Sequence, residues 1–143
     1  MPSEASDRAE VFDVLNRYGE GCDTRDWALF DRVFVPDATA DYGRSKLSSR
    51  DQIVALIRGA LGGCGPTQHL LGNHTARIDG DEAHASCKVR AFHQGAGDRS
   101  GASYELLGTY HHDLVRTADG WRTRHLRLDV AVEFGDRDVL QPE

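Results

Sequence analysis

Residues 67–94, TQHLLGNHTARIDGDEAHASCKVRAFHQ, contain two runs rich in apolar residues that are joined by Asp79-Gly80. An Asp-Gly pair between two such runs is typical of a tight β-hairpin turn, because glycine adopts the left-handed conformation that the turn needs. After the turn, apolar residues alternate with polar ones, at Ala83, Ala85, Cys87, Val89 and Ala91. This period of two predicts a strand with one buried face, and His93 continues that face.

Two further strands are predicted downstream of this hairpin. A glycine-rich loop precedes a long strand at residues 102–117, and Ala118-Asp119-Gly120 turns the chain into a last strand at residues 121–134. Consecutive strands joined by short turns pair with each other, so the second half of the chain predicts an antiparallel meander of about four strands.

The first half of the chain predicts mainly helices. An amphipathic stripe with helical spacing is formed by Val11, Val14, Leu15, Tyr18 and Cys22. A short helix is expected before Pro36, a brief strand at residues 38–42, and a further helix after the capping box at Ser49. Helices followed by a meander indicate an α+β fold: a single domain over residues 1–143, with N-terminal helices packed over a cone-shaped, curved antiparallel sheet. The mouth of such a cone forms a small-molecule pocket.

The composition excludes several classes of partner. The net charge of −6 and the absence of a basic cluster argue against nucleic acid. No apolar run approaches the roughly 20 residues that a membrane span requires. The N-terminal stretch is acidic rather than basic and apolar, and three cysteines without CxxC spacing are typical of reduced thiols. We therefore expect a cytoplasmic protein.

Acid–base chemistry is the kind of catalysis that the residue types support. The chain has seven histidines, but none has a metal-ligand spacing, and no nucleotide-binding or nucleophile motif is present. We therefore expect neither a metal nor a cofactor. Taken singly, the candidates also have structural explanations: Asp23 as an acid at a helix end, Tyr42 as an edge aromatic and His93 as a core residue. His74 is expected on the opposite strand face from His69.

Six short motifs in order make the catalytic interpretation more specific. They are CDTRDW (22–27), ADY (40–42), TQH (67–69), VRAFHQ (89–94), DGW (119–121) and LRLDV (126–130). Together they resemble scytalone dehydratase, a member of the SnoaL-like group with the nuclear transport factor 2 fold. The resemblance extends over residues 17–134, nearly the whole domain.

This resemblance implies a cofactor-independent dehydratase that eliminates water from a cyclic hydroxy-ketone or polyketide-like molecule. It implies that Asp23 is the conserved acid, that Tyr42 is one of two tyrosines that hold a water against the substrate carbonyl, and that His69 and His93 are the pocket histidines. Cys22 stands where the family has the second tyrosine, which suggests a substrate different from scytalone.

The resemblance also implies a set of substrate-binding positions. Thr109 falls where the family has a pocket serine and His111 where it has an asparagine, and Asp113 shares their strand face. With Cys22, these residues are expected to line the pocket. We expect His69 to be the main proton shuttle, supported by a pair formed by Asp23 and His93.

Two alternatives remain open from the sequence. The chain could be a SnoaL-like polyketide cyclase or ketone isomerase, or a non-catalytic small-molecule-binding module, since a fold does not determine a function. An open curved sheet also leads us to expect a homo-oligomer, either a dimer or a trimer. The C-terminal residues 135–143 could close the pocket or fray.

Overall fold

The computed structural model describes residues 3–140, which form a curved, unclosed six-stranded sheet in the order β2-β1-β6-β5-β4-β3. The four long strands form the predicted antiparallel meander: β3 (Thr67–Asp79), β4 (Glu82–Gln94), β5 (Ser103–Thr117) and β6 (Gly120–Gly135). The other two strands are β1 (Phe34–Asp41) and β2 (Lys46–Leu47). β1 joins β6 in parallel, a pairing that the sequence did not predict.

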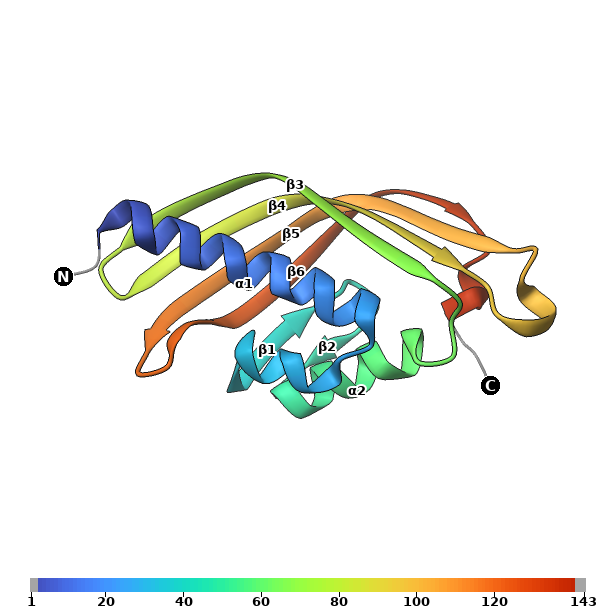
Figure 1. Cartoon of the computed structure of the whole chain (residues 1–143), viewed down its shortest axis with the longest axis horizontal. Coiled ribbons are helices and arrows are strands. Elements are labelled where there is room, and N and C mark those ends of the chain that lie inside the picture. Colours follow the sequence, from blue (N-terminus) through green and yellow to red (C-terminus); the bar gives the residue numbers. More distant parts are fainter. Residues whose placement is uncertain (1–2, 141–143) are drawn as a thin grey trace.

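The helices lie on the concave side of this sheet (Figure 1). The first, α1 (Glu4–Thr24), runs along the long strands, and a 3-10 helix, η1 (Trp27–Arg32), follows it. The second α-helix, α2 (Arg50–Leu61), begins at Ser49, whose side chain accepts a hydrogen bond from the backbone N–H of Gln52 as the capping box predicts. Two further 3-10 helices are η2 (Gly97–Arg99) and η3 (Arg137–Leu140). The predicted α+β class, with N-terminal helices over a curved sheet, is confirmed.

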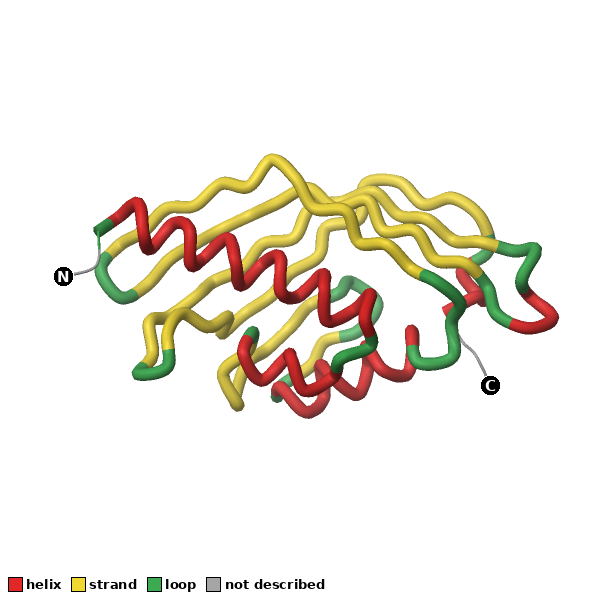
Figure 2. The backbone as a smooth tube through the Cα atoms, viewed as in Figure 1, coloured by secondary structure: helices red, strands yellow, loops and turns green. Residues whose placement is uncertain are grey.

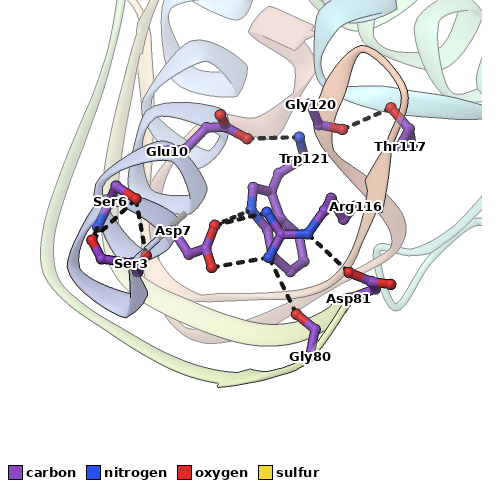
Figure 3. Close-up of polar contacts among 10 residues, drawn as sticks. All are labelled: Ser3, Ser6, Asp7, Glu10, Gly80, Asp81, Arg116, Thr117, Gly120 and Trp121. Atoms are coloured by element: carbon purple, nitrogen blue, oxygen red, sulfur yellow. Dashed lines mark hydrogen bonds and ion pairs between the residues drawn. The ribbon is translucent and has the colours of Figure 1, made fainter. Parts of the chain in front are cut away.

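The start of α1 is fastened to the hairpin of β5 and β6 by a buried polar cluster (Figure 3). Arg116 donates to both carboxylate oxygens of Asp7, each at 2.9 Å, and the indole of Trp121 donates to Asp7 at 3.1 Å. Hydrogen bonds from Arg116 and Trp121 lower the pKa of Asp7. Arg116 also binds Asp81, and Glu10 accepts from the backbone N–H of Trp121. This cluster fixes the N-terminal end of α1 on the sheet, and residues at the C-terminal end of α1 contribute to the site described below.

A bulge in the middle of β3 changes which residues face the helices. The register with β4 shifts between Gly72 and Thr75, and Asn73 has a left-handed φ of 53°. Before the bulge His69 faces inward; after it His74 does, and its Nε2 lies 2.8 Å from the Asn16 side chain on α1. The expectation that His74 faces away from His69 is therefore wrong, because one extra residue reverses the alternation. Figure 2 shows the resulting kink of β3.

A second irregularity occurs across the sheet, where the register of β5 with β6 shifts between Leu107 and Gly108. A Cβ at position 108 would overlap the carbonyl oxygen of Asp129, so only glycine allows this close approach of the two strands. The bend produced here and in β3 separates the half of the sheet that packs on α1 from the half that encloses a cavity.

Among residues 3–140, no helix has the length and apolar character needed to cross a membrane.

Candidate active site

An apolar cavity of about 160 Å³ lies between the concave side of the sheet and the helices. Its polar side chains come from α1, from the segment after β1, and from β3 to β6. They include Tyr18, Cys22, Tyr42, His69, His93, Tyr104 and Glu133. The remaining wall is mostly aliphatic, from residues of α2 and β6 such as Ile57, Leu61 and Leu128. The cavity therefore combines a few polar groups with an apolar lining, as small-molecule sites do.

Asp23 and His69 form a close pair at one wall of the cavity. Asp23 lies in the last turn of α1, and His69 lies near the start of β3. The carboxylate Oδ1 is 2.7 Å from His69 Nδ1, and Oδ2 accepts the backbone N–H of His69 at 2.7 Å. The Asp23–His93 pair expected from the sequence is wrong, because the last turn of α1 meets β3, and His69 stands between Asp23 and β4.

The carboxylate of Asp23 is held in its ionised form. Burial disfavours the charge, but hydrogen bonds from the side chain and backbone of His69, together with one from Thr67, outweigh it and lower the pKa of Asp23. An ionised carboxylate only accepts hydrogen bonds, so Nδ1 of His69 carries the proton that joins them. In the neutral imidazole with this tautomer, Nε2 of His69 carries the lone pair and can act as a base.

His93 is adjacent to His69 but has a different hydrogen-bond partner and a more buried environment. The two rings lie edge to face, with centroids 5.5 Å apart. His93 is 3% exposed, and burial lowers its pKa to about 4. Its Nδ1 donates to the carbonyl oxygen of Tyr104 at 3.0 Å, which leaves Nε2 as an acceptor. His93 is thus a neutral imidazole near pH 7.

Four tyrosines line the cavity, and the hydroxyl groups of two of them, Tyr18 and Tyr42, are in contact. The hydroxyl oxygens of Tyr18, on α1, and Tyr42, directly after β1, lie 2.8 Å apart. Burial raises the pKa of both phenols, so both remain protonated. When Tyr18 donates to Tyr42, the proton of Tyr42 is free to reach a carbonyl in the cavity. Cys22 lines the cavity one helical turn after Tyr18, and burial raises the pKa of its thiol.

The other end of the cavity carries a second polar group. The Tyr104 hydroxyl donates to Glu133 at 2.5 Å, and Arg44 lies 3.8 Å from the same carboxylate. Burial, followed by the hydrogen bond with Glu133, raises the pKa of Tyr104 to about 12. Arg137 and Leu140 of η3 also line the cavity, so the C-terminal segment packs against it as far as residue 140. Residues 141–143 lie outside the described residues.

Three of the residues expected to bind substrate lie on the opposite face of the sheet. Thr109 accepts from Lys88 at 3.2 Å, His111 lies 3.2 Å from Asp129, and Asp113 lies 2.9 Å from His84. The side chains of Thr109, His111 and Asp113, and those of their three partners, lie on the outer face of the sheet. The expectation that Thr109, His111 and Asp113 line the pocket is wrong, because the inward positions of β5 are the alternate ones, which are Tyr104, Leu106 and Tyr110.

Tyr18, Tyr104 and Glu133 were not identified as site residues from the sequence. A signal was present for two of them. Tyr18 belongs to the apolar stripe of α1 one turn before Cys22, and Tyr104 pairs with His93, which continues the buried face of β4. Glu133 had no such signal, because it lies in the part of β6 where every residue from position 130 onward is exposed.

No group of three or more His, Cys, Asp or Glu side chains suitable for holding a metal ion occurs within residues 3–140. Asp23, His69, His93 and the tyrosine hydroxyls can provide proton transfer and hydrogen bonding.

Similar proteins are found by sequence and by structure. The uncharacterised protein Rv2910c of Mycobacterium tuberculosis is 39% identical over 124 residues, which cover 84% of this chain and 82% of the relative. The crystal structure of Kfla4162 from Kribbella flavida is 26% identical with a TM-score of 0.89, and covers 96% of this chain and 99% of that one.

Two more distant structures share the fold. A nuclear transport factor 2-like superfamily protein from Salmonella enterica is 18% identical, with a TM-score of 0.82 over 91% of this chain and 94% of that one. A protein provisionally named scytalone dehydratase from Novosphingobium aromaticivorans is 19% identical, with a TM-score of 0.81 over 90% of this chain and 86% of that one. The SnoaL-like domain family matches residues 3–127. The chain therefore belongs to the SnoaL-like domain family, and its fold is that of the nuclear transport factor 2-like protein from Salmonella enterica.

Proposed function

We propose that the protein is a dehydratase that eliminates water from a cyclic β-hydroxy ketone. The observation that carries this proposal is the Asp23–His69 pair, in which the carboxylate holds Nδ1 of an imidazole that lines an apolar cavity together with a tyrosine hydroxyl pair. A base and a carbonyl-binding donor in one water-poor cavity are the two groups that enolate chemistry requires. A module that only binds ligands has no need for this convergence.

In the first step, Nε2 of His69 removes the proton on the carbon next to the substrate carbonyl. The electrons of that C–H bond move toward the carbonyl oxygen, where Tyr42 donates a hydrogen bond to the developing enolate. His69 becomes an imidazolium, and the ionised Asp23 at 2.7 Å stabilises its positive charge.

In the second step, the enolate re-forms the carbonyl and expels the β-hydroxyl group. The C–O bond breaks, a carbon–carbon double bond forms, and the imidazolium of His69 returns its proton to the departing oxygen, so that water leaves. His93 is neutral and offers Nε2 as an acceptor. It therefore orients the substrate hydroxyl toward His69 rather than supplying a proton.

The size of the cavity restricts the substrate. An apolar cavity of about 150 Å³ engineered in another protein accommodates benzene, and the cavity here is about 160 Å³. The enclosed part of the substrate is therefore a single six-membered ring, smaller than the two fused rings of scytalone. Cys22, where scytalone dehydratase has a tyrosine, is consistent with a different substrate.

A ketone isomerase is the second candidate, and Glu133 is the observation that favours it. An isomerase of the ketosteroid type uses a carboxylate base, and Glu133 lines the cavity beside the Tyr104 hydroxyl. Isomerisation moves a proton between two carbons and leaves the substrate mass unchanged.

The test is incubation of the purified protein with a panel of monocyclic β-hydroxy ketones in heavy water, followed by mass spectrometry. We expect loss of one water from at least one compound, and no loss with the His69→Ala variant. A matched panel of monocyclic β,γ-unsaturated ketones tests the isomerase, because these compounds have a double bond that can move into conjugation. Conversion of such a ketone to its conjugated isomer without loss of water would instead support the isomerase, and no change in any compound of either panel would contradict both reactions.

A further inference from the structure

Arg25 ties together the three segments that surround the Asp23–His69 pair. It follows α1 directly and adopts a left-handed φ of 59°, which turns its side chain back under the helix end. Its guanidinium donates to the carbonyl oxygens of Cys22 at 2.8 Å, Leu61 at 2.9 Å and Gly65 at 2.7 Å. These carbonyls belong to the end of α1, the end of α2 and the loop before β3.

The fourth acceptor of Arg25 is a side chain. Nη1 of Arg25 lies 2.8 Å from Oγ1 of Thr67, and the same Oγ1 lies 2.9 Å from Oδ1 of Asp23. A guanidinium can only donate hydrogen bonds, so Thr67 must accept from Arg25. The hydroxyl has a single proton, and Asp23 is the partner left to receive it.

These contacts determine which group donates and which accepts in each hydrogen bond from Arg25 through Thr67 to Asp23. Asp23 accepts three hydrogen bonds, from the Thr67 hydroxyl and from the backbone N–H and Nδ1 of His69. If Asp23 were protonated, its own O–H would need an acceptor, but the three groups around the carboxyl group are all donors. Without Arg25, the Thr67 hydroxyl could rotate and accept a proton from Asp23 instead. Arg25 disfavours this reversed arrangement, because its hydrogen bond occupies one lone pair of the Thr67 oxygen and leaves the hydroxyl proton to reach Asp23.

We propose that Arg25 and Thr67 are positioning residues that fix the proton direction of the Asp23–His69 pair, so that Nε2 of His69 stays free to act as the base. Neither residue is among those that line the cavity, so neither touches the substrate. The inference rests on the proposed function for its kinetic consequence, but the protonation of Asp23 can be measured without any substrate.

The primary test compares Thr67→Val with Thr67→Ser, because valine keeps the shape of threonine without the hydroxyl and serine keeps the hydroxyl. The carboxyl group of Asp23 is titrated by ¹³C NMR in each folded protein. We expect the pKa of Asp23 to rise in Thr67→Val and to stay at the wild-type value in Thr67→Ser. An unchanged pKa in Thr67→Val, or a serine variant that behaves like the valine variant, would overturn the proposal.

A double-variant comparison tests whether Arg25 acts through Thr67. Arg25→Lys keeps the positive charge but loses the planar set of donors. We expect it to raise the pKa of Asp23 when Thr67 is present and to add nothing when combined with Thr67→Val. Additive effects would show that Arg25 acts on Asp23 directly, against the proposal.

Kinetics provide the readout that a purely structural role would not change. With any substrate found active, Thr67→Val should lower kcat by roughly tenfold to a hundredfold, the effect of losing a hydrogen bond to a charged group, with KM unchanged. Thr67→Ser should restore kcat. If no substrate is dehydrated, the proposed function fails while the titration still decides this inference.

Discussion

The carboxylate of Asp23 contacts His69 and not His93, although both imidazoles lie on the same cavity. One histidine is therefore paired with a negative charge, whereas the other donates to a neutral carbonyl and has its pKa lowered by burial to about 4. The two imidazole rings, whose centroids are 5.5 Å apart, therefore have different hydrogen-bond partners and different proposed roles. This difference leads to the first two predictions.

Replacement of Asp23 by Asn should abolish most of the activity without unfolding the protein. The amide has nearly the same shape, but it bears no charge to stabilise the imidazolium of His69. We expect kcat to fall by roughly 10²–10⁴-fold, the range that general acid–base catalysis contributes, with a thermal midpoint close to that of the wild type. His69→Ala should give a similar loss.

Asp26→Asn is the matched control, because Asp26 is an exposed carboxylate three residues further along the chain. It should retain wild-type turnover. Full activity in Asp23→Asn, or a protein that no longer folds, would contradict the assignment of Asp23.

His93 should make the folded protein less stable in mild acid. Its pKa is about 4 in the folded state against an ordinary value of 6.5, so between these pH values the unfolded chain binds a proton that the folded one does not. Stability is therefore complete above about pH 6.5 and falls as the pH decreases toward 4. The shift corresponds to a loss of roughly 3 kcal/mol in the free energy of unfolding.

Chemical denaturation at a series of pH values measures this dependence. His93→Gln should flatten it but not remove it, because burial also lowers the pKa of His112, to about 3. The same slope in the variant and the wild type would show that His93 does not titrate as described.

The two tyrosines should contribute to turnover unequally. Tyr42→Phe removes the hydroxyl that donates to the enolate oxygen, and loss of one such donor lowers kcat by about 10²–10³-fold. Tyr18 acts through Tyr42, at 2.8 Å, so Tyr18→Phe should have a smaller effect. The double variant should be no slower than Tyr42→Phe alone. Turnover measurements that show additive losses would mean that each hydroxyl contacts the substrate independently.

The outer face of the sheet predicts association with a second copy of the chain. Two adjacent rows across β3 to β6 expose large apolar side chains: Leu70, Phe92, Val132 and Phe134 are 61%, 38%, 43% and 53% exposed. Between them lies the ion pair of Arg90 and Glu105, with N and O atoms 2.7 Å apart. We propose a homo-oligomer through this face, because a face with both apolar groups and balanced charges is complementary to itself.

Light scattering coupled to size-exclusion chromatography should give a mass of two or three chains. Phe134→Glu should reduce it to that of one chain, whereas Arg124→Glu, on the same strand but away from the apolar rows, should not. A wild-type protein that runs as a monomer at micromolar concentration would refute the proposal.

The elements with strong local patterns were predictable from the sequence. The Asp79-Gly80 hairpin, the capping box at Ser49 and the alternation of Ala83 to Ala91 each depend on neighbouring residues, and the structure contains all three. The prediction that His69, His93, Tyr42 and Cys22 line one cavity, with Asp23 beside them, followed from a resemblance and not from these patterns.

Contacts between distant segments were not predictable. The parallel pairing of β1 with β6 and the choice of His69 as the partner of Asp23 depend on how α1 meets the sheet. The outward position of Thr109, His111 and Asp113 could have been deduced. Cys87 and Ala91 are buried on β4, and their partners on β5 are Tyr110 and Leu106, which leaves the odd-numbered residues of β5 on the outer face.

The bulge at Asn73 divides β3 into two stretches whose inward residues follow opposite parity. Before the bulge, the inward-facing His69 lines the cavity; after it, the inward-facing His74 contacts Asn16 of α1. Changes in the first stretch can therefore alter what the pocket accepts while the helix keeps its support. A single strand thus allows the substrate range of this domain to diverge during evolution without a matching loss of its scaffold.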